Sequence, residues 1–359
     1  LNDASQILSA KESTERYSEF WENPGEYDVW FLGTSHMYNA IHPMELWDKY
    51  GIRSYNLGAS SSCMPQTYWT LMCALEYSKP KVIVLDAYKV HLDKKYQNQQ
   101  LIHLGMDSIP FSGVKIKGIC DLFDNWNERF EHICGFSVYH NRWEGLEERD
   151  FNWQRSSMKG ASLNNNIEDK SKYQIIDKAV KMDYMDVVGL VYFKKILEEC
   201  KEREINVVLT AIPFCSNRKQ QRAMNVIPEI AKKYDVPYLN MIYEDMMDYD
   251  IDFADDNHAN LFGAKKITLY IGDYLTGHYN LMDYRDSGEI SKQWNKDYER
   301  YLNEKLERMR GSTELRLYVQ WLLDERYTCY LYRKEEPEGL LAKEFAQLDN
   351  ISLISEEEA

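Results

Sequence analysis

The stretch YDVWFLGTSHM at residues 27–37 is an apolar run that stops abruptly at small residues and a serine. Such a run predicts a buried first β-strand that ends in a turn. In an open α/β sheet, ligands bind beyond the carboxyl ends of the strands, so Ser35 stands where a reacting side chain is expected. The alternative interpretation is a turn serine that satisfies nearby backbone amides.

A candidate base for Ser35 lies far downstream, in a DDNH segment that ends at His258. A serine hydroxyl needs such a base to accept its proton. Asp255 and His258 share one short loop, so the carboxylate can hold the imidazole in one tautomer while the other ring nitrogen faces Ser35. Asp252 and Asp256 are alternatives to Asp255. The structural alternative is a histidine at a helix start, with Asp255 as the N-terminal cap.

Apolar runs and helical spacings alternate along much of the chain. This alternation predicts parallel strands joined by right-handed crossover helices, which is an α/β fold. After the first strand, we expect strands at 53–57, 81–87, 206–213 and 237–241. We expect helices at 41–50, 65–77, 187–203, 218–234 and 261–276.

Two regions depart from this alternation. Residues 89–180 lack a long apolar period and are interpreted as an inserted, partly helical cap. Residues 292–311 predict a charged, solvent-exposed helix. The end of the chain, 314–354, predicts a strand–helix–strand unit that runs through 328–332 and 340–348. We therefore expect an α/β domain over 1–280, with the insertion, and a helix plus a small α/β region over 281–359. One large domain with insertions is the alternative for a chain of 359 residues.

Composition excludes several classes of protein. With 44% hydrophobic and 28% charged residues the chain is typical of an ordered protein, and a formal net charge of −15 argues against nucleic acid as a partner. No apolar run reaches the roughly 18 residues that a membrane helix needs. The sequence begins with Leu1 and not with methionine. We therefore expect that an upstream segment, such as a signal or an anchor, precedes it in the full protein. The seven cysteines form no C-x-x-C pair, which argues against a disulfide scaffold or a zinc site.

Three short blocks together resemble the SGNH (GDSL-type) hydrolase superfamily. They are Gly33-Thr34-Ser35 after the first strand, Asn56-Leu57-Gly58 after the second and Asp255-x-x-His258 near the end. The resemblance implies a flavodoxin-like three-layer α/β/α sandwich, without cofactor or metal. An α/β-hydrolase fits less well, because that fold uses G-x-S-x-G and here Met37 occupies the second glycine position.

The resemblance also implies roles for single residues. Ser35 would be the nucleophile, His258 the base and Asp255 the residue that orients it. The backbone N–H groups of Ser35 and Gly58 would form the oxyanion hole. The family's third donor is an asparagine after the third strand, but Asp86-Ala87-Tyr88 stands there. A carboxylate at this position would repel an oxyanion unless it points elsewhere.

Further candidates lie beside the nucleophile and in the insertion. His36 follows Ser35 directly and is either a substrate contact or a histidine with a local partner. The cluster Tyr139-His140-Asn141-Arg142-Trp143 is either the buried aromatic face of a helix or a set of substrate contacts. In the second case Asn141 or Arg142 would enter the cleft, and Tyr139 and Trp143 would stack on a sugar.

The departures resemble one branch of the superfamily, the O-acetylation proteins of cell-surface polysaccharides and the D-alanine transfer protein of teichoic-acid synthesis. This resemblance implies serine-dependent hydrolysis or transfer of an acyl ester on a carbohydrate or cell-envelope polymer. It also implies a membrane-bound protein that donates the acyl group, and an extracytoplasmic location with an N-terminal anchor. A noncatalytic carbohydrate-binding or assembly protein on the same fold is the alternative, favoured by the missing asparagine.

Overall fold

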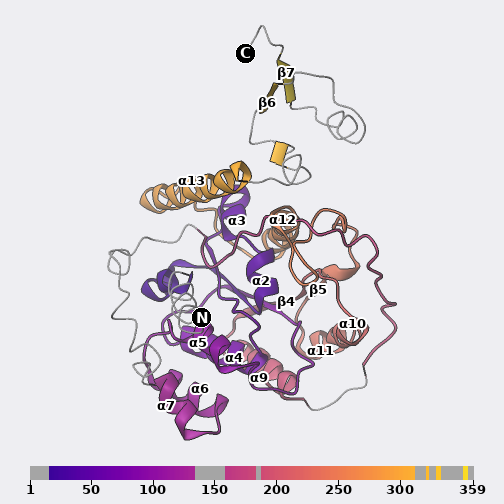
Figure 1. The fold of residues 1–359 in the computed structure, drawn as a ribbon. Coiled ribbons are helices and arrows are strands. Elements are labelled where there is room, and N and C mark those ends of the chain that lie inside the picture. The colour runs from indigo at the N-terminus through magenta and orange to yellow at the C-terminus, as the bar shows by residue number, and fades with distance from the viewer. Residues whose placement is uncertain are drawn as a thin grey trace.

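A computed structural model describes residues 16–133, 158–182, 187–311, 321–322, 329–332 and 351–354. Its centre is a five-stranded, all-parallel sheet with the strand order β2-β1-β3-β4-β5 (Figure 1). The strands are β1 Val29–Leu32, β2 Ser54–Asn56, β3 Val82–Asp86, β4 Asn206–Ala211 and β5 Tyr238–Asn240. All five coincide with predicted strands, which confirms the α/β fold.

The central strands are buried on both faces, as their apolar sequences require. Every residue of β1 and β3 is buried. Alternate residues of β1 enter different hydrophobic clusters, Trp30 and Leu32 on one side and Val29 and Phe31 on the other. Because both faces are apolar, helices cover the sheet on both sides, with α4 and α9 on one side and α3 and α12 on the other (Figure 1).

The helices follow the predicted positions, with two differences. A short helix, α2, begins at Ser35 itself, and the helix predicted over 218–234 is divided into two. Pro228 lies in the first turn of the second of these, where its missing N–H costs no hydrogen bond. The helices are α2 Ser35–Ala40, α3 Pro43–Tyr50, α4 Met64–Ala74, α5 Gln99–Met106, α6 Gly113–Leu122, α7 Trp126–Ile133, α9 Val188–Glu202, α10 Arg218–Met224, α11 Ile227–Tyr234, α12 Leu261–His278 and α13 Glu289–Arg310.

The described part of the insertion consists of helices α5 to α7 and the segment 158–182. The three helices share their own hydrophobic cluster, and α6 packs on α4, where Asp121 accepts a 2.7 Å hydrogen bond from Trp69 Nε1. The segment 158–182 runs beside the sheet instead, since Lys159 O accepts from Asn56 N and Asn164 O accepts from Leu261 N. The partly helical character is therefore as predicted, and a cap over the cleft remains a prediction.

Helix α13 corrects the expectation of a solvent-exposed helix over 292–311. Its Trp294 and Tyr301 are fully buried. Two of its charged residues are also buried and paired, Asp297 with Lys159 at 2.6 Å and Lys305 with Glu45 of α3 at 2.8 Å. The charged residues suggested an exposed helix, but Asp297 and Lys305 are buried because they pair with opposite charges from other parts of the chain.

Beyond α13, strand β6 Cys329–Tyr332 pairs in parallel with β7 Ile351–Ile354. The first matches the strand expected near 328–332, whereas the region 340–348 lies outside the described residues. Among the helices that are described, none combines the length and apolar character that crossing a membrane requires.

Candidate functional site

Ser35 lies at the carboxyl end of β1, at the start of α2. Thr34 is the N-cap of that helix, and its Oγ1 accepts a hydrogen bond from His36 N at 3.2 Å. The preceding turn needs glycine, because a Cβ on Gly33 would lie 2.8 Å from the Cβ of Asp86. As the first residue of a helix, Ser35 has an N–H with no partner inside that helix.

His258 lies in the loop before α12 and contacts Ser35. The two are 223 residues apart in sequence, and His258 Nε2 lies 2.8 Å from Ser35 Oγ. The loop that carries the histidine is held by an antiparallel bridge between Phe253 and Ala259. Ala254 N also donates to His258 O at 2.9 Å. These backbone contacts hold the loop that carries the imidazole.

Asp255 completes a three-residue chain. Its Oδ2 lies 2.8 Å from His258 Nδ1, and its Oδ1 accepts from the backbone N–H groups of Asn257 and His258. Burial acts to raise the pKa of Asp255, but the hydrogen bonds from His258 and Asn257 outweigh it, so the pKa is lowered. An ionised Asp255 selects the tautomer with the proton on Nδ1, which leaves Nε2 free to accept the Ser35 proton.

The other two aspartates have different partners. Asp252 pairs with Lys266, and the exposed Asp256 pairs with Lys170 at 2.6 Å. The N-cap of α12 is Asn260, whose Oδ1 accepts from Phe262 N and Gly263 N. The alternative in which Asp255 caps this helix is therefore wrong.

The predicted oxyanion hole is only partly open. Gly58 lies close to the Ser35 turn, since a Cβ there would meet Thr34 O at 2.9 Å. Its N–H, however, donates to Asn56 Oδ1 at 3.0 Å. The amide of Asn56 in turn donates to Met37 O and Ile41 O, so it is held in place. The donor that remains is the N–H of Ser35.

Asp86, the last residue of β3, is 1% exposed. Its Oδ1 accepts from Tyr88 N at 3.2 Å, whereas Oδ2 has no hydrogen-bond partner among the residues that the structure describes. Burial raises its pKa to about 7, against opposing effects of the Tyr88 amide and the Lys89 charge. A carboxyl group that is protonated up to near neutral pH repels an oxyanion much less than an ionised one.

His36 is buried beside Ser35, between two aromatic rings. Its ring centroid lies 3.9 Å from that of Tyr88 and 4.5 Å from that of Phe214, and it meets the His258 ring edge to face at 6.0 Å. Its Nδ1 has no hydrogen-bond partner in the described part of the chain. Burial, together with the charges of His258 and Lys89, lowers the pKa of His36 well below its ordinary value. The His36 imidazole is therefore uncharged near neutral pH and lines the site next to Ser35.

Sequence reasoning missed the aromatic partners of His36 because they follow β3 and β4, far apart in the chain. The signal was their position, since both come directly after buried strands. The predicted substrate contacts Tyr139, Asn141, Arg142 and Trp143 lie outside the described residues, so their roles remain predictions.

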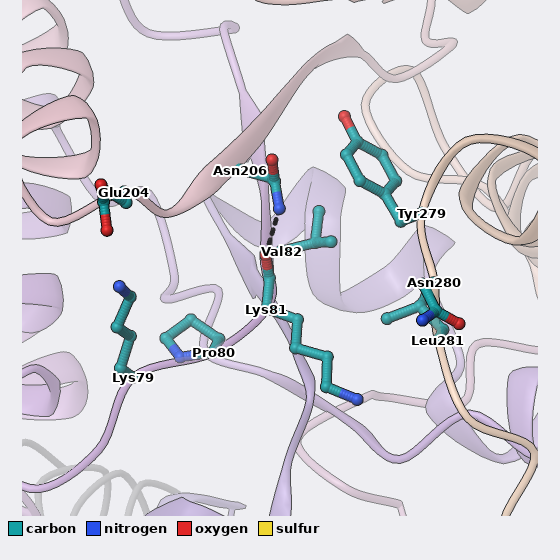
Figure 2. Close-up of a pocket in the computed structure, with 9 residues that line it drawn as sticks. All are labelled: Lys79, Pro80, Lys81, Val82, Glu204, Asn206, Tyr279, Asn280 and Leu281. Atoms are coloured by element: carbon teal, nitrogen blue, oxygen red, sulfur yellow. Dashed lines mark hydrogen bonds between the residues drawn. The ribbon is translucent and has the colours of Figure 1, made fainter.

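Two other features of the described chain lie apart from Ser35. An open hollow of about 440 Å³ adjoins the amino ends of β3 and β4, where Asn206 donates to Lys81 O (Figure 2). This is the edge of a parallel sheet opposite to the one where ligands bind. His103, Asp107 and His132 could together approach a metal ion. The two imidazoles stack at 3.8 Å, however, so their lone pairs lie in parallel planes and one ion could not meet both without ring rotation.

A comparison with protein-family models and with curated proteins finds no match to this chain.

Proposed function

We propose that the chain is a serine-dependent esterase or acyltransferase of the SGNH type. The observation that carries this proposal is the continuous chain of contacts from Ser35 Oγ through His258 to Asp255, with both links at 2.8 Å. A hydroxyl, an imidazole and a carboxylate in this order are the parts of nucleophilic acyl transfer. The strand order 2-1-3-4-5 is that of flavodoxin-like sandwiches, which supports the superfamily.

In the proposed reaction Ser35 Oγ attacks the acyl carbonyl while His258 Nε2 takes the hydroxyl proton. The Ser35 N–H donates to the oxyanion that forms. His258 then gives its proton to the departing alcohol, leaving an acyl ester on Ser35. Water or an acceptor hydroxyl attacks this ester with His258 again as base, and the serine is regenerated.

The proposed substrates are acyl esters of a carbohydrate or cell-envelope polymer, with O-acetyl as one example. The resemblance supports this choice, together with an extracytoplasmic location and a membrane-bound partner that supplies the acyl group. The relay of side chains suits hydrolysis and transfer equally, because the two differ only in the second attacking hydroxyl.

The test is covalent labelling with a fluorophosphonate, followed by peptide mass mapping. We expect the label on Ser35, and we expect Ser35→Ala and His258→Ala to abolish it. Ser60→Ala is a matched control, since Ser60 Oγ bonds to Tyr38 OH and not to a histidine. Labelling of a different serine, with Ser35 unmodified, would refute the proposed nucleophile.

A second candidate, a noncatalytic carbohydrate-binding protein, is favoured by one observation. The Gly58 N–H is already bonded to Asn56 Oδ1, so one expected oxyanion donor is occupied. This candidate predicts no turnover of p-nitrophenyl acetate by the unaltered protein and glycan binding that persists in Ser35→Ala. Turnover that disappears in Ser35→Ala would reject it.

A further inference from the structure

Lys89 is a buried cation directly after β3, and it is 8% exposed. An ammonium carries three N–H donors. Within the described part of the chain, Nζ makes a single hydrogen bond, to Ser61 O at 3.3 Å. Burial lowers the pKa of Lys89, which reports the cost of holding a charge there. Two of its donors thus have no acceptor among the described residues.

The other buried lysines of the described chain are better compensated. Lys159 is bonded to the carboxylates of Glu19 and Asp297, and Lys305 to that of Glu45. Lys115 has two carbonyl acceptors, Ile109 O at 2.7 Å and Asp107 O at 3.3 Å. Lys89 differs from Lys159 and Lys305 because no described carboxylate lies within ion-pairing distance of its Nζ. It differs from Lys115 because it has one described acceptor and not two. The nearby Asp86 acts on it only at longer range.

The neighbours of Lys89 place it beside the proposed nucleophile. Its Nζ lies 5.6 Å from the ring centroid of Tyr88, and that ring stacks on His36, the residue after Ser35. Its acceptor, Ser61, belongs to the loop after β2 that also contains Gly58. The ammonium therefore lies where the carboxyl ends of β1, β2 and β3 meet. The charge of Lys89 also acts on His36, because it contributes to the lowered pKa of that imidazole.

We propose that Lys89 binds an anionic group, a carboxylate or a phosphate, on the ester that Ser35 acts on. This inference rests on the proposed function and adds the charge of the substrate to it. A buried ammonium with unused donors is stabilised by an anion that brings its own acceptors. The chain has a formal net charge of −15, so anions are repelled in general, and a local cation is needed to hold one at this site.

Binding to Ser35→Ala protein tests the proposal without depending on turnover. Calorimetry would compare monoethyl glutarate with diethyl glutarate, and glycerol 3-phosphate with glycerol. The first pair reports a carboxylate on the acyl side, and the second a phosphate on the alcohol side. We expect one charged compound to bind roughly 10- to 100-fold more tightly than its neutral counterpart, the size of one charged hydrogen bond.

Variants then assign the effect to Lys89. Adding Lys89→Met should remove the preference for the charged compound, and Lys89→Arg should retain much of it. Lys115→Met is the matched control, since it removes a buried lysine of α6 that has two carbonyl acceptors, and it should leave the preference unchanged. Thermal melting establishes that each variant is folded.

Equal binding of charged and neutral compounds in both pairs would overturn the proposal, as would a preference that survives in Lys89→Met. These results differ from failure of the proposed function, which would be absence of fluorophosphonate labelling at Ser35. A preference that depends on Lys89 in a protein without esterase turnover would support the anion site and reject the esterase.

Discussion

Replacing Asp86 by asparagine should change how the stability of the fold depends on pH. Asp86 is 1% exposed, and burial raises its pKa from 3.8 to about 7. The folded protein therefore binds the carboxyl proton more tightly than the unfolded chain does. Stability from this group is fully present below about pH 4 and is lost as the pH rises through about 7. The difference between the two pKa values corresponds to about 4 kcal/mol.

Asparagine keeps the acceptor for Tyr88 N and cannot ionise, so the variant should not lose this stability. Between pH 5 and pH 8 the free energy of unfolding of Asp86→Asn should rise by roughly 3 kcal/mol relative to the unaltered protein. Urea unfolding monitored by circular dichroism at a series of pH values measures this difference. The exposed Asp250→Asn is the control and should give a nearly constant difference. Parallel pH profiles for Asp86→Asn and the unaltered protein would show that Asp86 is ionised in the fold, and the reasoning would be refuted.

Three further changes test the site and its supports. Asp255→Asn should lower kcat for p-nitrophenyl acetate by roughly 10²- to 10⁴-fold, because the amide no longer selects the reactive imidazole tautomer; an unchanged kcat would contradict this. Gly160→Ala should lower the free energy of unfolding by about 2 kcal/mol or more, since φ is +83° and its Cβ would lie 1.9 Å from Asn56 O; urea unfolding with an unchanged midpoint would refute it. Glu45→Gln should cost about 3 kcal/mol in the same assay, because Lys305 loses a buried carboxylate; a loss below about 1 kcal/mol would show that the ion pair contributes little.

The central sheet could be predicted from sequence because each strand is marked by an apolar pattern in its own few residues. β1 and β3 are short apolar runs bounded by turns, and such runs are typical of strands that are buried on both faces. Ser35 and His258 could also be selected as candidates from the sequence, since each lies next to the end of a predicted strand or helix. Their 2.8 Å contact needed the structure, because spacing along the chain does not give distance across a sheet.

Where prediction failed, the cause was pairing between distant parts of the chain. Helix α13 looked exposed because Asp297 and Lys305 are charged, and their partners Lys159 and Glu45 are more than a hundred residues away. Lys89 was overlooked for a related reason, since a single lysine after a strand carries no local sign that it is buried. Charge alone does not report burial when the compensating group is remote.

The strand order has a consequence for synthesis on the ribosome. The first three strands to emerge, β1 to β3, are neighbours in the finished sheet, and β4 and β5 then add in turn at the same free edge. The chain is synthesised from its amino terminus at about 5–20 residues per second. Ser35 is therefore present long before residues 255–258 leave the ribosome, and its hydroxyl has no base during that time. Under the proposed function, we expect a chain released after residue 240 but before residue 255 to contain all five strands and yet be inert, because it lacks Asp255 and His258.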